Sequence, residues 1–492
     1  MAGCWPLLAM SLGASAMPVL HYTRPCVNEG GGSRDISAAI TIDGAHHTWQ
    51  LCEGGWHHAV STDLVSWRSL GVDLDEWPSG FVVAADDGRA CAGFLGADGA
   101  GVSARCAAAV ADHPWTFGAE RPWFRVDFYR PLPLDPFRPF RDSDGRYYIG
   151  VAMDGCNGTT RAAPCDAGGT LQLWSSASLD GPWNMLPRPM LATNQSLFAG
   201  RSEAHELVTV EFLGFGGGKR ALLNNAYFAR GSTEYFLGTQ ENGGPLDVEH
   251  QWMLDFGEFA PRRDGRGTGL GALNDSHVND PSGGRFAMAR CFGSGPDTVR
   301  GDGRRICVGW VNGGSDLGTP NATSFSTQSV PREVFAEGAR LLQAFPRELR
   351  TLRTAHASTR TAGVALEGGL LVEVRATFRA AASAVEKFGF FVLGEAEVFV
   401  DPLRRLACVD ATHMGNAEVR CGPVLLRGDV VTIHAIADHS VVTVLVDDGA
   451  TAITAAANPA LPARLDVTPF APPAVSLSAD VWRLDAPAHT YA

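Results

Sequence analysis

The sequence predicts an all-β fold, and three observations support this. Runs of β-branched and aromatic residues bounded by turn residues recur at 145–153, 169–174, 220–223, 235–238 and 305–310. The 492 residues include 57 glycines and 29 prolines, which suit many short elements joined by turns. Hydrophobic residues at 45% and charged residues at 19% are typical of a folded chain rather than a disordered one. Together these features favour a sandwich, a barrel or a propeller.

The first residues resemble an export signal. A short apolar stretch closes on Ala14-Ser15-Ala16, which is similar to a signal-peptidase site, although no basic segment precedes it. We therefore expect residues 1–20 to be a signal peptide or leader of a secreted or vacuolar protein. A misassigned start or an unstructured leader is the alternative.

The cysteines also favour an oxidising compartment. Without Cys4, ten of the eleven cysteines remain, and an even number at hairpin-like separations suits disulfides better than zinc, because no Cys-x-x-Cys pair occurs. Sequence alone does not determine the connectivity. The adjacent couples are Cys26 and Cys52, Cys91 and Cys106, Cys156 and Cys165, Cys291 and Cys307, and Cys408 and Cys421. Four glycosylation sequons, at Asn157, Asn194, Asn274 and Asn321, agree with a secreted glycoprotein.

The charge distribution narrows the class of partner. With 40 basic and 53 acidic residues the net charge is −13, and no basic run occurs, which argues against nucleic acid or a membrane surface as the main partner. Only two lysines are present, so chemistry based on carboxylates is favoured over Schiff-base chemistry. The pairs His46-His47 and His57-His58 would each place one ring on either face of a strand, so no metal site is expected. No cofactor is expected either, and the oligomeric state is left open.

Composition changes along the chain suggest two domains. Residues 264–303 are rich in Gly, Asp, Arg and Ser, and we expect a long surface insertion there. From about residue 362 onward, alternating apolar runs such as 370–378 and 441–446 indicate a second, all-β domain.

Five blocks of sequence, in order, resemble glycoside hydrolase family 32, the family of invertases, inulinases and fructosyltransferases. The segment 56–67 is similar to the family pattern W-G-H-A-V-S-x-D-L-V-x-W. The further blocks are Asp255-Phe-Gly with 304–312 (D-Y-G and R-R-I-L-W-G-W-x-N), 328–334 (Q-S-I-P-R-x-V), 341–349 (L-L-Q-x-P-x-x-E-L) and 437–454 (A-D-H-S-x-V-E-x-F-x-x-G-x-T-x-I-T). The resemblance implies a five-bladed β-propeller over residues 21–353 and a β-sandwich over 354–492.

The resemblance also implies three catalytic acids. Asp35 lies eight residues before Asp43-Gly44, the spacing of the family's nucleophile from its downstream D-G. Asp135 stands in the place of the family's R-D-P aspartate, which stabilises the transition state, and Glu203 aligns with the acid/base glutamate of W-E-C-P-D-L. These roles match what retaining glycosyl cleavage requires, an ionised nucleophile and a protonated acid. The implied activity is cleavage of terminal β-fructofuranosyl linkages of sucrose or fructans.

Five further residues are implied to bind the substrate: Trp49, Gln50, Trp56, Ser79 and Asp255.

The supporting residues of the acids differ from the family pattern. The N-D-P-N-G box reads Arg34-Asp35-Ile36-Ser37-Ala38, and R-D-P reads Leu134-Asp135-Pro136, which removes a cation beside the acids. A rival alignment places Glu29 at the nucleophile position. A fructosyltransferase, or an impaired homologue that binds fructosyl sugars or regulates a partner enzyme, is the alternative function.

Overall fold

The structure is a computed structural model. It describes residues 20–22, 36–52, 55–74, 80–96, 101–107, 115–125, 136–154, 169–192, 209–215, 217–225, 233–256, 286–293, 303–312, 326–380, 385–414, 419–424, 428–457 and 465–490. Within these ranges the chain forms seven antiparallel sheets and two short 3₁₀ helices, so the all-β prediction is confirmed.

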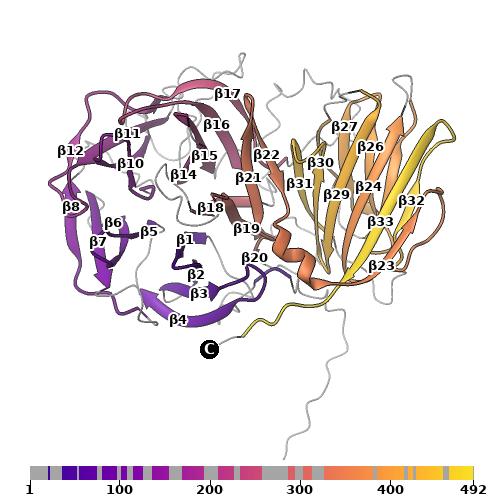
Figure 1. Cartoon of the computed structure of the whole chain (residues 1–492), viewed down its shortest axis with the longest axis horizontal. Coiled ribbons are helices and arrows are strands. Elements are labelled where there is room, and N and C mark those ends of the chain that lie inside the picture. The colour runs from indigo at the N-terminus through magenta and orange to yellow at the C-terminus, as the bar shows by residue number, and fades with distance from the viewer. Residues whose placement is uncertain are drawn as a thin grey trace, which may run out of the picture.

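Five sheets of four or five strands follow one another along the chain and stand in a ring (Figure 1). Their strands are, in blade 1, β1 (Ile36–Ile42), β2 (Ala45–Cys52), β3 (Gly55–Ser61) and β4 (Arg68–Leu74); in blade 2, β5 (Gly80–Ala84), β6 (Ala90–Leu95), β7 (Gly101–Ala107) and β8 (Arg121–Arg125); in blade 3, β9 (Phe140–Arg141), β10 (Tyr147–Asp154), β11 (Gly169–Ser176), β12 (Asn184–Met185) and β13 (Leu191–Ala192); in blade 4, β14 (Thr209–Gly214), β15 (Lys219–Asn225), β16 (Thr233–Thr239) and β17 (Asp247–Met253); and in blade 5, β18 (Phe286–Phe292), β19 (Ile306–Asn312), β20 (Ser326–Gln328), β21 (Arg332–Glu337) and β22 (Arg340–Ala344).

Each blade begins with its innermost strand. Strand β1 of blade 1 contacts β5 of blade 2 and β18 of blade 5, and β18 in turn contacts β14 of blade 4. The first strands therefore surround a common axis, and the ring is a five-bladed β-propeller.

The strand runs read from the sequence coincide with β10, β11, β15, β16 and β19. The surface insertion expected at 264–303 is wrong for its central part, because β18 lies inside it. All seven residues of β18 are buried. The apolar run Phe-Ala-Met-Ala-Arg-Cys-Phe is short, and the Gly-rich residues on either side mask it when composition is averaged over the whole segment.

Two larger sheets form the second domain. The six-stranded sheet has the order β23-β33-β24-β29-β30-β31 and the five-stranded sheet has the order β28-β27-β26-β25-β32. Their bounds are β23 (Arg353–Thr359), β24 (Leu371–Ala380), β25 (Phe388–Val392), β26 (Ala396–Asp401), β27 (Leu406–Asp410), β28 (Val419–Pro423), β29 (Val430–Asp438), β30 (Val441–Val446), β31 (Thr451–Ala456), β32 (Thr468–Phe470) and β33 (Val475–Leu484), with the 3₁₀ helices η4 (Arg347–Leu352) and η5 (Thr412–Met414). Alternate residues of both sheets enter one apolar core of Val, Ala, Phe and Ile side chains, so the domain is a β-sandwich.

The two domains join through η4 and through contacts between blades and sandwich. Phe256, after the last strand of blade 4, forms a parallel bridge with Ile453 of β31. The end of the chain leaves the sandwich, since Thr490 pairs with Arg68 and accepts a 2.8 Å hydrogen bond from the Ser69 amide in blade 1. Thr490, which follows the last strand of the sandwich, therefore contacts the propeller.

Three of the expected disulfide couples are present. The pairs Cys91–Cys106, Cys291–Cys307 and Cys408–Cys421 are bonded, and in each pair the two residues lie directly opposite each other on neighbouring strands. Cys52 is also disulfide-bonded. Cys26, Cys156 and Cys165 lie outside the described residues, so the other two couples stay predictions.

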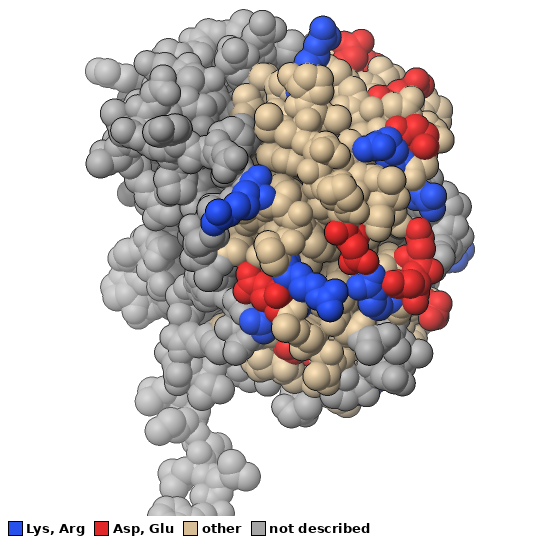
Figure 2. Space-filling model, turned by 90° about the vertical axis from the view of Figure 1, so that its left-hand side faces the viewer, with Lys and Arg blue, Asp and Glu red and all other residues tan. Residues whose placement is uncertain are grey.

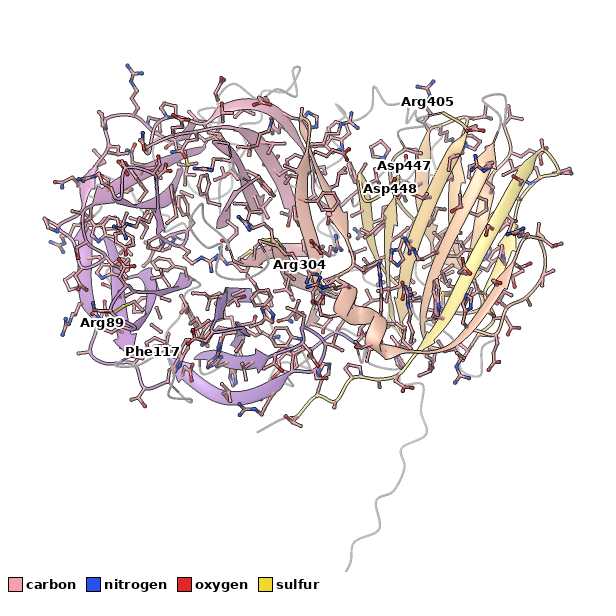
Figure 3. All side chains as sticks on the ribbon, in the orientation of Figure 1. Arg89, Phe117, Arg304, Arg405, Asp447 and Asp448 are labelled. Carbon is pink, nitrogen blue, oxygen red and sulfur yellow. A yellow bond between two sulfur atoms is a disulfide. The ribbon has the colours of Figure 1, made fainter. Side chains whose placement is uncertain are left out.

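The propeller surface carries charges of both signs. Figure 2 shows basic and acidic side chains interspersed on the face turned toward the viewer. Arg89, labelled at the left in Figure 3, forms two ion pairs. It pairs with Asp87 at 2.7 Å in its own blade and with Asp180, which follows β11 of blade 3, at 2.8 Å. Among the described residues, no helix has the length and apolar character needed to cross a membrane.

Candidate active site

The starts of three inner strands define the candidate site. Asp35, Asp135 and Glu203 lie outside the described residues, as does Ser79. The described chain resumes directly after Asp35 at the first residue of β1, and directly after Asp135 at Pro136, which bridges to Val151 ahead of β9. Six residues after Glu203 it resumes at β14. Because every blade begins with its innermost strand, these three starts lie at the same end of the propeller axis.

Gln50 is held at the start of β1. It is the cross-strand partner of Ile36, the residue that follows Asp35, and only 1% of Gln50 is exposed. Its side-chain amide donates to Gln328 Oε1 at 3.3 Å and to the Tyr22 carbonyl at 3.4 Å. Of the residues expected to bind substrate, Gln50 is thus the one paired with the first residue of β1.

Two buried arginines form contacts between blades near the propeller axis. Arg138, three residues after Asp135, donates to the carbonyl of Ala39 in β1 at 2.7 Å and to that of Cys291 in β18 at 2.9 Å. It also pairs with Glu211 of β14 at 3.2 Å. One guanidinium of blade 3 therefore contacts blades 1, 4 and 5. Burial lowers the pKa of Arg138, Glu211 opposes this shift, and the neighbouring charge of Arg290 adds to it.

The second arginine, Arg290 of β18, is 2% exposed and donates from Nε to the Ile36 carbonyl at 3.3 Å. Neither arginine is predicted as a site residue from the sequence. The available signal was an arginine inside a strongly apolar run, which predicts a buried cation that requires polar partners.

Two of the expected substrate residues pack in an apolar cluster of the propeller. Trp49 and Trp56 are completely buried, in the cluster that fills the space between blades 1 and 2. The Trp49 indole donates to Asp73 at 3.0 Å, and its ring stacks on His58 at 4.3 Å. Both rings are therefore inside the protein, and their role toward a sugar stays a prediction.

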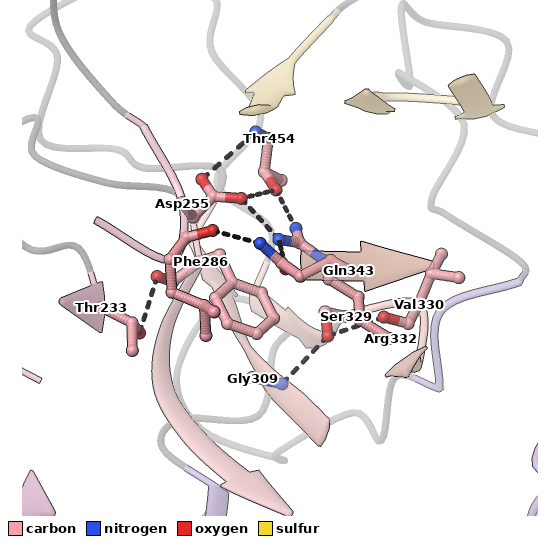
Figure 4. Close-up of polar contacts among 10 residues, drawn as sticks. Thr233, Asp255, Phe286, Gly309, Ser329, Val330, Arg332, Gln343 and Thr454 are labelled. Carbon is pink, nitrogen blue, oxygen red and sulfur yellow. Dashed lines mark hydrogen bonds and ion pairs between the residues drawn. The ribbon is translucent and has the colours of Figure 1, made fainter. Parts of the chain in front are cut away.

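Asp255, which is also expected to bind substrate, has contacts inside the protein. Its carboxylate is fully buried and pairs with Arg332 of blade 5 at 2.7 Å (Figure 4). It also accepts bonds from the amide and the hydroxyl of Thr454 in the sandwich, at 3.2 and 2.8 Å. Both oxygens therefore have partners within the protein, and the residue holds the two domains together.

The histidine pairs behave as strand alternation predicts. His47 and His58 face each other on neighbouring strands, with His47 Nδ1 2.9 Å from His58 Nε2, while His46 contacts Thr41. His58 Nδ1 lies 2.7 Å from Asp73, and burial lowers the pKa of His58 although Asp73 opposes the shift. In the described part of the chain, no group of three or more such side chains is placed to hold a metal ion.

The arrangement of a five-bladed propeller joined to a β-sandwich is shared with solved structures that are 15–16% identical to this chain. Residues 346–483 match the family model described as "Glycosyl hydrolases family 32 C terminal". The resemblance to glycoside hydrolase family 32 is therefore confirmed, by sequence in the second domain and by fold over the whole chain.

Solved structures with the same fold include three fructoside-related enzymes. Fructan 1-exohydrolase IIa from Cichorium intybus, in complex with 1-kestose, is 16% identical with a TM-score of 0.71, and the match covers 98% of this chain and 100% of that one. The GH32 β-fructofuranosidase of Bombyx mori is 15% identical with a TM-score of 0.70, covering 96% and 94%. The exo-inulinase of Aspergillus awamori is 15% identical with a TM-score of 0.66, covering 95% and 98%. No curated protein matches the chain.

Proposed function

We propose that the protein is a retaining β-fructofuranosidase-type glycoside hydrolase that acts on sucrose or a fructan. The observation that carries the proposal is the position of the three acids in the chain. Asp35 and Asp135 directly precede inner strands, Glu203 precedes another by six residues, and those strands begin at one end of the axis. Convergence of carboxylates is what glycosyl cleavage requires.

In this proposal Asp35 attacks the anomeric carbon of the fructosyl unit as a carboxylate. Glu203 starts protonated and gives its proton to the leaving oxygen, and it then removes a proton from the water that releases fructose. Asp135 stabilises the positive charge that develops on the ring and binds sugar hydroxyls. The carboxyls of Asp35 and Glu203 should lie roughly 5–5.5 Å apart, the spacing for direct nucleophilic attack.

The titration of the acids sets the expected pH dependence. Repulsion between neighbouring carboxylates should raise the pKa of Glu203, so that it stays protonated while Asp35 is ionised. Activity should then be greatest on the acidic side of neutrality. The disulfides and the sequons support a secreted or vacuolar location for the enzyme.

The test compares four variants with the unmodified chain on sucrose and 1-kestose. We expect Asp35→Asn, Asp135→Asn and Glu203→Gln each to lower fructose release by about a thousandfold or more. The three carboxyl groups act as a unit, so the loss of one removes most of the catalysis. Asp87→Asn changes an exposed carboxylate of blade 2 that is not among the three acids. This variant is the control and should retain full activity. Equal background rates in all five proteins would reject the enzyme in favour of a homologue that binds fructosyl sugars. Products longer than the substrate would identify a fructosyltransferase.

A further inference from the structure

Residues 20–22 are buried and bonded to the sandwich. Leu20, His21 and Tyr22 are each at most 3% exposed. Their anchor is Asp438, the last residue of β29, whose side chain is fully buried. Asp438 Oδ2 accepts hydrogen bonds from the Leu20 amide at 2.7 Å, from the His21 amide at 3.1 Å and from His21 Nδ1 at 2.6 Å. A buried carboxylate requires donors, and this segment supplies three of them.

His439 holds the same carboxylate from its other oxygen. The ring Nδ1 of His439 lies 2.8 Å from Asp438 Oδ1, and the backbone amide of His439 donates to the Leu370 carbonyl at 2.6 Å. The left-handed backbone of His439, with a φ of +53°, belongs to the turn between β29 and β30. Both residues lie in the block 437–454, which resembles a family pattern although the proposed reaction does not use it.

The Tyr22 carbonyl connects blades 1 and 5. It accepts from the Gln328 amide of β20 at 3.2 Å, from the Thr327 hydroxyl at 3.4 Å and from the Gln50 side chain of β2 at 3.4 Å. Among the described strands, no sheet contains strands of both blades. The seam between the first and the last blade therefore has no strand ladder of its own, and a carbonyl of residues 20–22 bonds to both sides of it.

The other end of the chain meets the same segment. The last residues run from the sandwich back to blade 1 (Figure 1), where the Trp67 amide donates to His489 Nδ1 at 3.2 Å. The ring of His489 meets the ring of Tyr22 edge-on, with centroids 5.6 Å apart and an interplanar angle of 81°. Both ends of the described chain thus pack together on blade 1.

We propose that residues 20–22 form a strap, fastened by Asp438, through which the sandwich keeps the propeller ring closed between blades 1 and 5. The strap is short, so the bonds at Asp438 fix the position of the Tyr22 carbonyl two residues later. Releasing the strap at Asp438 should therefore loosen the seam between the blades, although Asp438 belongs to the other domain. The device does not depend on the catalytic reaction.

Hydrogen–deuterium exchange, resolved to single amides by mass spectrometry, reports the strap directly. The Gln328 amide donates to the Tyr22 carbonyl, whereas the next amide, that of Ser329, donates to the Gly309 carbonyl at 2.7 Å inside blade 5. Asp438→Asn keeps the size of the side chain but replaces one acceptor oxygen with a donor. The Gln328 amide should then exchange at least about tenfold faster, because bonds to a charged acceptor are lost. The Ser329 amide should keep its rate.

The matched control is Glu373→Gln. Glu373 is another buried carboxylate of the six-stranded sheet, and it accepts bonds from Arg353 and His434. This variant weakens the sandwich and leaves the bonds of the strap in place. The Gln328 amide should therefore remain as protected as in the unmodified chain.

Two substitutions of His21 test the strap from its own side. His21→Asn retains a nitrogen donor near the position of Nδ1 and should keep the protection of the Gln328 amide. His21→Leu retains the bulk without the donor and should accelerate exchange at Gln328. This pair decides the question if Asp438→Asn does not fold.

Three results would overturn the inference. They are unchanged exchange at Gln328 when the strap is released, an equal acceleration at Ser329, which would mean that blade 5 itself opens, and an equal acceleration at Gln328 in Glu373→Gln. The measurements use no sugar. A chain that releases no fructose therefore rejects the proposed function and leaves the strap to be judged by exchange alone.

Discussion

The ion pair between Asp255 and Arg332 should make a large contribution to stability. Both side chains are at most 1% exposed, and their charged atoms are 2.7 Å apart. Asp255→Ala leaves the guanidinium of Arg332 buried without its carboxylate, and breaking such a pair on one side costs about 3–5 kcal/mol. The remaining partners of Arg332, Gln343 at 3.2 Å and the Thr454 hydroxyl, are neutral and do not replace the charge.

The expected change in melting temperature follows from the size of the chain. An unfolding entropy of about 2.1 cal/mol/K per residue gives about 1 kcal/mol/K for the whole chain unfolding together. Asp255→Ala should therefore lower Tm by about 3–5 °C in differential scanning calorimetry. The double variant Asp255→Ala with Arg332→Met should recover a large part of this loss, because no buried unpaired charge remains.

The matched control is Glu367→Ala, which breaks the exposed pair with Arg483, where both side chains are at least half exposed. It should leave Tm unchanged within about half a degree. Equal Tm values for Asp255→Ala and Glu367→Ala would refute the reasoning. The same variants also test the predicted substrate role of Asp255: a loss of kcat/KM on sucrose at unchanged Tm would support that role.

Two further predictions concern stability in the sandwich and at its junction with the propeller. Burial alone would raise the pKa of Glu373, but hydrogen bonds from His434 at 2.7 Å and Arg353 at 2.6 Å hold the pKa at about 2. The stabilisation is thus complete above the unfolded pKa near 4.3 and is lost as the pH falls toward about 2. Glu373→Gln should flatten the acid side of a plot of Tm against pH, and an unaltered slope would contradict this. Gly449 has a φ of +88°, and a Cβ there would lie 1.7 Å from the Gln343 carbonyl oxygen of blade 5. Gly449→Ala should lower Tm by at least twice as much as Gly428→Ala, which has a φ of +80° and open space around it; equal losses would show that backbone strain alone is responsible.

Local sequence patterns indicated the all-β class, a change of domain along the chain and the cysteine couples, three of which are bonded in the structure. A strand can be recognised from the pattern of apolar side chains over a few residues, as at 441–446, where β30 lies. A disulfide between neighbouring strands of a meander joins cysteines that are close in the sequence, so Cys408 and Cys421 could be coupled before the sheet was known. The short strand β18 was not predicted, because residues typical of turns lie on both sides of it in the sequence.

The roles of single residues at the site depended on tertiary contacts. Whether Trp49 faces a sugar or a core is set by blade 2, and the partners of Asp255 lie 77 and 199 positions away in the chain. No local pattern records which strands meet at the axis, so Arg138 and Arg290 could not be recognised there from sequence. Their carbonyl partners belong to other blades and come together only when the ring closes. The sequence by itself determined the all-β class and the family that the chain resembles, while closure of the propeller and its docking on the sandwich decided which charged groups meet.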